Sequence, residues 1–299
     1  MSLGNKIDFA VIFSVKNANP NGDPLDSNRP RKTYDGLGEV SDVCLKRKMR
    51  DRLMEMKLPI FVQSDDNKAD EFPSLRARSE AAKLPMDDPK TLHAEACAKW
   101  FDVRAFGQVF PFSAKKKAKK TKTDETEDNS SDKGVSVGIR GPVSIQPAFS
   151  VAKIDVSSEQ IIKSTSLDGD GINRQSDQMG MKHRVDKGVY VFYGSMNPQL
   201  AAKTGFSDED AQAIKIVLPK LFENDSSSAR PEGSMRVLKV IWWQHNCPSG
   251  QASSAKVHGT LNVGEDGSFT FKSKDLDVLE DGTIQIGASL LKPDIIDGF

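Results

Sequence analysis

The sequence predicts an α+β fold with an antiparallel sheet. Apolar residues occupy every second position between Lys6 and Lys16, which is the pattern of a half-buried strand. Leu45, Met49 and Leu53 instead have the i, i+4, i+8 spacing of an amphipathic helix. The clearest segments of the chain follow in the order strand, helix, strand, strand, helix, strand, which is the order of the split βαβ (ferredoxin-like) unit.

The first half of the chain adds a long loop and an insertion to this strand and helix. Asn, Pro, Gly and Asp dominate 17–38, so this segment is predicted as an ordered loop. Ser41 is the expected N-cap of the helix, which ends near Lys57. A second helix is expected at about 91–101. The charged segment 113–134, with six lysines between 115 and 122, predicts a flexible tether.

The second half is predicted to contain strand segments at 135–155, 188–197 and 235–245. A helix capped by Ser207 and ending near Phe222 separates the last two. Between the second and third strands of the unit, 164–187 is expected to be a loop-like insertion. The expected organisation is one unit made of 1–58 and 135–250, an inserted region at 59–134, the insertion at 164–187, and a C-terminal extension at 251–299 with hairpin signals.

Length and composition exclude several classes of protein. The chain has 299 residues, a mean hydropathy of −0.48 and no apolar run long enough for a membrane span, so we expect a soluble cytoplasmic protein with no membrane partner. Its three cysteines are an odd number and lie too far apart for a zinc site, which predicts reduced thiols. No metal and no cofactor are expected.

Charge is segregated along the chain although the net charge is zero. The segment 29–57 has nine basic and five acidic residues, whereas 264–299 has three basic and eight acidic residues. A local cationic surface is what phosphate binding requires, because Lys and Arg displace counterions only where they meet the backbone. The sequence therefore favours a nucleic-acid partner for the region after the first strand.

Two segments supply candidate RNA-binding residues. In the first loop and helix they are Asn19, Asn21, Arg29, Arg31, Lys46, Lys48 and Arg50. Amide and cationic side chains can bind sugar and phosphate without reading bases. In the second insertion they are Arg174, Gln178, Met179, Lys182, His183 and Arg184. A hairpin of this composition can push an apolar tip between bases. The alternative interpretations are a solvated helix face and an ordinary flexible hairpin.

Patterns that elsewhere signal catalysis do not fit their context here. Gly134–Gly138 matches G-x-S-x-G, but a nucleophile elbow needs a strand before it and a helix after it, and here a charged run precedes a strand. Asp168–Ile172 resembles a calcium loop that lacks its later ligands. No two histidines stand at i, i+4. We predict no catalytic residue and no enzymatic activity, and interpret Asp23 and Asp26 as turn-capping residues.

Several segments together resemble one known family. These are 17–50, with its Asn-Pro-Asn-Gly-Asp-Pro run, then Trp100–Gly107, Arg140–Val143, and Met179–Val185 leading into Tyr190. They resemble the backbone subunit of type I CRISPR Cascade, most nearly subtype I-C, within the repeat-associated (RAMP) superfamily. The resemblance covers most of 6–245, and the tail beyond Ser249 matches no part of it.

The resemblance implies a modified RNA-recognition-motif palm, a thumb hairpin and web or finger insertions. Several copies would polymerise head to tail along one CRISPR RNA, and the bases between regularly spaced kinks would pair with a target DNA strand. The guide contacts it implies are Asn19, Asn21 and Arg31 in the loop, Lys46 and Arg50 on the helix, and residues 179–184 in the thumb. Implied protein partners are further copies of the chain, the large Cascade subunit and the subunit that caps the 5′ end of the guide.

Two enzymatic alternatives remain open within the same superfamily. One is a metal-dependent ribonuclease that cuts target RNA through a loop aspartate, Asp23 or Asp26. The other is an endonuclease that processes CRISPR RNA. A protein that only presents a guide is expected to use phosphate, amide and shape contacts, since base pairing supplies the specificity.

Overall fold

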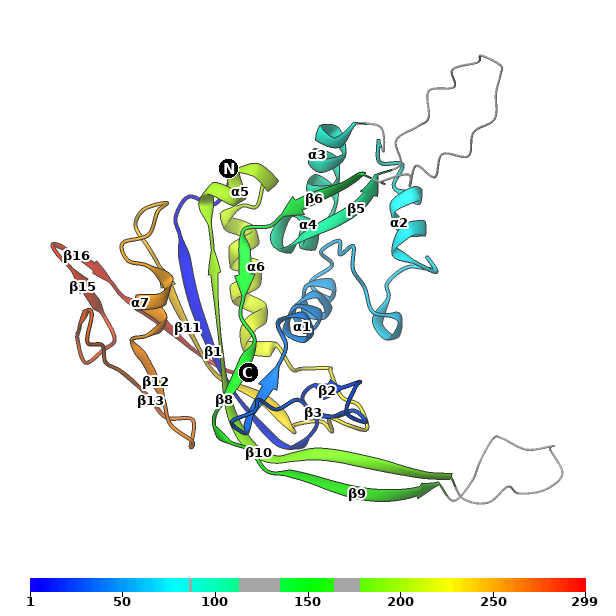
Figure 1. Cartoon of the computed structure of the whole chain (residues 1–299). Coiled ribbons are helices and arrows are strands. Elements are labelled where there is room, and N and C mark those ends of the chain that lie inside the picture. The colour runs from blue at the N-terminus through cyan, green and yellow to red at the C-terminus, as the bar shows by residue number, and fades with distance from the viewer. Residues whose placement is uncertain (86–87, 113–134, 164–177) are drawn as a thin grey trace, which may run out of the picture.

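The computed structural model describes residues 1–85, 88–112, 135–163 and 178–299. The strands of its largest sheet are β1 (Ile7–Ala18), β4 (Leu37–Val40), β7 (Val143–Ile145), β8 (Ala148–Lys153), β9 (Val156–Lys163), β10 (Gln178–Met196), β11 (Met235–Gln244) and β17 (Pro293–Asp297). Within the described residues the strand order is β17-β11-β1-β10-β8-β4, with β7 and β9 also paired to β10 (Figure 1). Every pairing in this sheet is antiparallel. The predicted mixed fold with a large antiparallel sheet is confirmed.

Strand β1 lies between β10 and β11, so both of its edges are hydrogen-bonded. Phe9 lies directly opposite Gly194 of β10. A Cβ at Gly194 would lie 2.2 Å from Phe9 Cζ, so only glycine leaves room for the ring at this position. The ring also stacks on Trp242 of β11, with centroids 5.6 Å apart. The alternation places Ile7, Phe9, Val11, Phe13 and Val15 on one face of the sheet. The predicted half-buried strand is wrong, however, because Ala10 and Ile12 are buried on the other face.

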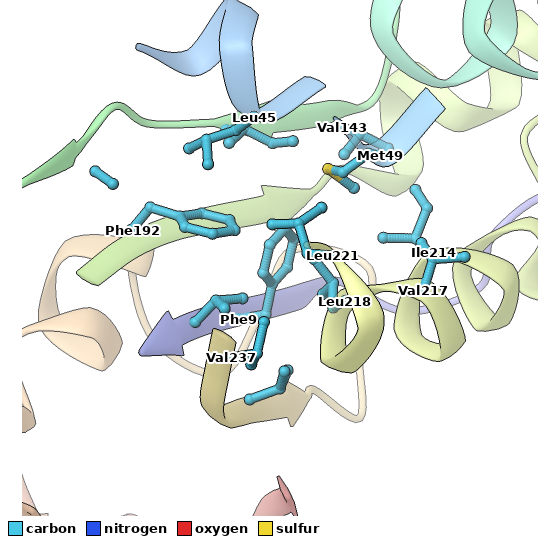
Figure 2. Packing of buried hydrophobic residues seen from close by; sticks show 14 of the residues in the cluster. Phe9, Leu45, Met49, Val143, Phe192, Ile214, Val217, Leu218, Leu221 and Val237 are labelled. Atoms are coloured by element: carbon cyan, nitrogen blue, oxygen red, sulfur yellow. The ribbon is translucent and has the colours of Figure 1, made fainter. Parts of the chain in front are cut away.

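That face is covered by the helices α1 (Asp42–Glu55) and α6 (Asp208–Val217) and by the short 3-10 helix η2 (Leu218–Lys220). Figure 2 shows Leu45 and Met49 of α1 and Ile214 of α6 gathered around Phe9 and Phe192 of the sheet. All five side chains are fully buried. Truncating a residue of this kind to alanine costs about 2–5 kcal/mol, so these contacts hold α1 firmly on the sheet.

Both predicted helix caps are confirmed. The Ser41 hydroxyl accepts a hydrogen bond from the backbone N–H of Cys44. The Ser207 hydroxyl accepts from the N–H of Asp210, whose carboxylate accepts in turn from the N–H of Ser207. Helix α1 ends at Glu55, where Met56 leaves helical geometry, and α6 ends at Val217, where the chain continues as the 3-10 helix η2.

The opposite face of the sheet is covered by the C-terminal extension. Its elements are α7 (Ser254–His258), β12 (Leu261–Val263), β13 (Phe269–Phe271), β14 (Asp277–Val278), β15 (Ile284–Ile286) and β16 (Ser289–Leu291). Val257 and Leu261 pack with Ile12 of β1 and with Ile241 and Trp243 of β11 in a second buried cluster. The extension is thus a second layer on the sheet, and β17 adds a strand to the edge of β11.

The inserted region has a small core of its own. Its elements are the 3-10 helix η1 (Asp65–Asn67), α2 (Leu75–Ala81), α3 (Pro89–Lys99), α4 (Phe101–Phe106), β5 (Gly107–Phe112) and β6 (Val135–Arg140). Trp100 packs with Phe61 and Phe110 in a third buried cluster. The helix α5 (Pro198–Thr204) follows β10. No helix in the described part of the chain combines the length and hydropathy needed to cross a membrane.

Three segments differ from the expectation. The helix expected at about 91–101 is α3, which ends at Lys99 because Trp100 has extended backbone, and a further helix, α4, follows it. The long loop contains two short paired strands, β2 (Gly22–Asp23) and β3 (Arg29–Pro30), and ends in β4. The prediction of a loop at 164–187 is wrong for residues 178–187, because these residues belong to β10. The predicted flexible tether at 113–134 lies outside the described residues.

Candidate nucleic-acid interface

The predicted loop, helix and second insertion meet at one end of the sheet (Figure 1). Ala18, the last residue of β1, pairs with Val185 of β10. Beyond that pair, β10 continues with β9 as a two-stranded arm that leaves the body of the molecule. The loop begins directly beside the root of this arm, and its strand β3 contacts β10.

Asn19 and Asn21 shape the loop through their side chains. The Asn19 amide is almost completely buried and donates to the carbonyl of Asn28 at 2.7 Å. The Asn21 side-chain oxygen accepts from both the backbone N–H and the hydroxyl of Ser41, at 2.9 and 2.8 Å. Because Ser41 is the N-cap of α1, Asn21 fastens the loop to the start of that helix. Both side chains, predicted as RNA contacts, are bonded within the protein and shape the loop.

The cations of the loop remain accessible. Arg29 is exposed on β3, and Lys32 is exposed two residues beyond that strand. Arg31 is about one-third exposed, and its guanidinium lies 3.6 Å from the carboxylate of Asp23. An ion pair of this kind in solvent contributes less than about 1 kcal/mol, so it does not prevent the arginine from binding a phosphate.

The cations Lys46 and Arg50 of α1 have different environments. Lys46 is partly exposed and pairs with Asp42 at 2.9 Å, one turn earlier on the helix. The Arg50 side chain is only 11% exposed, and it is hydrogen-bonded to Asp102 of α4. Of the two predicted helix contacts, Lys46 therefore presents the more accessible charge.

Lys48 faces the interior of the protein. Its side chain has no exposed surface, and its ammonium is hydrogen-bonded to Asp225 and lies over the Phe222 ring. Burial lowers the pKa of Lys48, against the opposing effect of the Asp225 charge. With no surface left for a phosphate, Lys48 belongs to the fold, and we leave it out of the interface that was predicted to include it.

The arm combines exposed apolar residues with charged ones. Met179 is 69% exposed and lies opposite Ile162 of β9, which is 58% exposed. Lys182 is partly exposed on the opposite face of β10. The Arg184 guanidinium pairs with Glu159 of β9 at 2.6 Å. An arm with bare apolar residues in its described part is suited to contact another surface or a base.

His183 belongs to the root of the arm. Its ring is buried, and Nδ1 shares a hydrogen bond of 2.8 Å with the hydroxyl of Ser158, its partner across β9 and β10. Gln178 is the first residue of β10 and pairs with Lys163. Arg174, the remaining candidate of this insertion, lies outside the described residues.

Sequence reasoning missed the other half of the arm. Strand β9 contributes Glu159, Ile161 and Ile162, none of which was a candidate. The segment lacks the alternation of a half-buried strand, because both of its faces point away from the core. The only local signal is the adjacent pair Ile161 and Ile162 beside a polar insertion.

Two of the enzymatic candidates, Asp23 and Ser136, have structural roles in the described residues. The Asp23 carboxylate accepts from the N–H of Leu25 at 3.1 Å, which is the turn-capping role expected of it. Ser136 lies within the hairpin of β5 and β6 and pairs with Pro111, so it does not stand on an elbow between a strand and a helix. The described residues contain no group of three or more His, Cys, Asp or Glu side chains arranged to hold a metal. The calcium-like segment 168–172 lies outside them.

Fold and site together define a mixed α/β protein that presents a cationic loop, a helix and an arm at one end of an antiparallel sheet. The family model described as CRISPR-associated protein Cas7 matches residues 5–287, and the chain belongs to that family. The match includes most of the C-terminal extension, for which no resemblance was expected.

This chain is similar to a curated relative and to chains of two solved structures. CRISPR-associated protein Cas7 of Haloferax volcanii is 26% identical over 278 residues, which cover 91% of this chain and 79% of the relative. A chain of a structure titled CRISPR RNA-guided surveillance complex, pre-nicking, matches with a TM-score of 0.47 and 15% identity, covering 88% of this chain and 84% of that one. A chain of a CRISPR RNA-guided surveillance complex matches with a TM-score of 0.41 and 16% identity, covering 88% and 77%.

Proposed function

We propose that this chain is the backbone subunit of a CRISPR RNA-guided Cascade complex and binds CRISPR RNA without reading its sequence. The observation that carries the proposal is the convergence of the loop, the start of α1 and the root of the arm, made by the Asn21–Ser41 hydrogen bonds and the Ala18–Val185 pair. Membership of the Cas7 family over 5–287 supports it. The groups presented there are cations and backbone amides, which suit a sugar-phosphate chain.

We also propose the finer assignments that the resemblance implied. The palm is a modified RNA-recognition motif, which is supported by the sheet order β11-β1-β10-β8 with α1 and α6 packed on one face. The subtype remains the proposed I-C. The arm is the thumb, and the inserted region is the web or finger. No step in this role requires a catalytic group, so the chain acts as a binding subunit. Its proposed location is the cytoplasm.

Head-to-tail polymerisation along the guide is part of the proposal. The arm has exposed apolar residues, Ile162 and Met179 among them. Their exposure supports a contact with another copy, because apolar residues of this kind are normally covered in an assembled protein. A contact between unlike surfaces of successive copies continues without closing and produces a helix. The guide bases held outward by this helix pair with a target DNA strand. The large subunit and the 5′-capping subunit complete the complex.

The test is purification of the chain from cells that carry an intact guide array. We expect RNA of one guide length to be bound, and the elution size to fall to that of a monomer after ribonuclease treatment. Protein that carries no RNA, or that keeps its size without RNA, contradicts the proposal.

A further inference from the structure

A groove outside the candidate interface lies at the end of the sheet, on the face that carries the C-terminal extension. Its volume is about 680 Å³. Four cations from four different strands line it, and they are Lys16 of β1, Lys153 of β8, Lys187 of β10 and Arg236 of β11. All four side chains are exposed. None of them was a candidate in the sequence or has a role in the interface built around α1.

Strand pairing arranges these cations as a row. Lys16 lies directly opposite Lys187, and Arg236 lies opposite Ser14, two residues before Lys16. Since β11, β1, β10 and β8 are consecutive in the sheet, the row crosses three gaps between strands. At about 4.8 Å per gap it extends over roughly 14 Å. Like charges directly opposite each other destabilise a sheet. A bound anion would offset the repulsion between Lys16 and Lys187.

The protein itself supplies little compensation for this charge. Among the described residues, none of the four cations is within ion-pair distance of a carboxylate. Two acidic residues line the rim, Glu265 and Asp266. The Asp266 carboxylate accepts from the N–H and the hydroxyl of Ser268, so it is engaged by its own turn. The lining keeps an excess of positive charge.

We propose that this groove binds the phosphodiester backbone of a single-stranded nucleic acid other than the guide. Several charges in a row suit a chain of phosphates, and the hydroxyls of Ser14 and Ser234 add neutral donors. The apolar part of the lining is Val15, Val151, Ala152 and Val189, and none of the described residues that line the groove is aromatic. An acidic protein segment would be expected to use aromatic anchors as well, so the lining favours a phosphate chain.

The second strand is the favoured source because of where the groove lies. Lys16 and Lys187 are on the sheet face of Ile12 and Val189, whereas α1 packs on the face of Phe9 and Phe192. The thickness of the sheet therefore separates the groove from Lys46. This inference rests on the proposed function, since pairing of the guide with one strand of a duplex displaces the other strand.

The experiment uses the full chain assembled with guide RNA and a labelled oligothymidylate that has no complement in the guide. The test variant is Lys16→Gln with Lys187→Gln, and the control is Lys272→Gln with Lys274→Gln, two exposed lysines outside the groove. Each phosphate contact to a single strand contributes about 0.7 to the salt slope of log affinity. We expect the test variant to lose about 1.4 of that slope and about 25-fold in affinity at 0.1 M salt. The guide content of both variants should equal that of the wild type.

Three outcomes would overturn the proposal. Unchanged oligothymidylate binding by the test variant means that the groove holds no strand. A matching loss of guide RNA assigns the groove to the path of the guide itself. A smaller multimer on guide RNA, with guide affinity per copy unchanged, assigns it to an acidic segment of a second copy. Failure of the proposed function has a different signature, because the wild type would then carry no guide at all.

Discussion

Arg50 and Asp102 join helix α1 to the inserted region through an almost buried ion pair. Arg50 Nε donates to Asp102 Oδ2 at 2.9 Å, and the Asp102 side chain is 1% exposed. The same carboxylate accepts from the backbone N–H groups of Phe61 and Val62, at 2.7 and 3.0 Å. The Arg50 guanidinium also lies over the Phe106 ring, 5.1 Å from its centroid. Arg50 therefore holds two parts of the fold together in addition to any contact with RNA.

Replacing Arg50 should destabilise the protein. We expect Arg50→Ala to lower the free energy of unfolding by about 3 kcal/mol, because it leaves the Asp102 carboxylate buried without its charged partner. Urea denaturation measures the change. Lys46→Ala is the matched control, since the pair of Lys46 with Asp42 is partly exposed and its loss should cost less than about 1 kcal/mol. Equal losses in the two variants would show that the Arg50 pair is not structural.

Replacing Lys46 should weaken RNA binding, whereas replacing Lys48 should not. Lys46→Ala should weaken guide binding equally for guides of any sequence, by about 5-fold at 0.1 M salt, and lower the salt slope by about 0.7. Lys48→Met should leave guide affinity unchanged, because the Lys48 side chain has no exposed surface. Fluorescence titrations at several salt concentrations give both quantities. A loss that depends on guide sequence would contradict a backbone contact.

Lys48→Met should also change stability little. Arg47 and Arg230 remain bonded to Asp225, at 2.9 and 3.1 Å, so the carboxylate keeps charged partners. A methionine of similar length can fill the space beneath Phe222, and replacing a buried charge by a well-packed apolar group is often neutral or stabilising. We expect a change within about 1 kcal/mol in urea denaturation. A loss of several kcal/mol would mean that the buried ammonium is needed for folding.

The sequence predicted those elements that carry a local pattern. Strand β1, the helices α1 and α6 and strand β11 have their own periodicity, and Ser41 and Ser207 mark the helix starts. Strand β9 has no such pattern, because it is a strand only through its pairing with β10. The C-terminal extension was expected only as hairpins, since the apolar face it covers, with Trp243 at its centre, comes from distant segments.

The candidate site was predictable only in part for the same reason. Helix spacing shows that Lys46 and Arg50 share a face, but it does not show what lies against that face. The partner of Arg50 is 52 residues away in the sequence and that of Lys48 is 177 residues away. The asparagines lie in the loop after β1, as the sequence indicated, yet Asn21 bonds to the start of α1, which becomes evident only when Ser41 is beside it.

The loop aspartates give a direct test of the enzymatic alternative. Protein assembled with guide RNA should leave complementary RNA intact in the presence of Mg²⁺, because the Asp23 carboxylate is engaged by the Leu25 N–H and lies beside Arg31. Gel analysis of labelled RNA measures cutting. Cuts at regular spacing that disappear in Asp23→Ala would establish a target ribonuclease. Cleavage of repeat RNA by the purified chain would instead establish a processing endonuclease.

A buried polar cluster attaches the C-terminal extension to β1. Asp8 of β1 is fully buried, and its Oδ2 accepts from His245 Nε2 at 2.9 Å. His245 Nδ1 accepts from the N–H of Gln251, which fixes the tautomer that donates to Asp8. His258 of α7 lies 3.6 Å from Asp8 Oδ1 and stacks on Tyr193, and Lys6 lies 3.5 Å from Oδ2.

This cluster should make the protein less stable in mild acid. Burial lowers the pKa of His258 below its ordinary 6.5, and the Asp8 charge only partly opposes this. The unfolded chain therefore binds a proton at His258 before the folded chain does, and the free energy of unfolding should decrease as the pH falls below 6.5, by at most about 1.4 kcal/mol per pH unit. Burial raises the pKa of Asp8, but the hydrogen bond from His245 and the nearby positive charges outweigh it, so the Asp8 contribution is lost only below 3.8.

His258→Gln separates this effect from the other titrations of the chain. The variant has no group that protonates at this position. The slope of its free energy of unfolding against pH should therefore be smaller than that of the wild type between pH 7 and 5, by up to about 1.4 kcal/mol per pH unit. Urea denaturation at several pH values, followed through the fluorescence of Trp243 and the other tryptophans, gives the slopes. His93→Gln is the control, because His93 lies on the surface of α3, away from Asp8. If the slopes of wild type and His258→Gln coincide, His258 is not the group that makes the extension sensitive to acid.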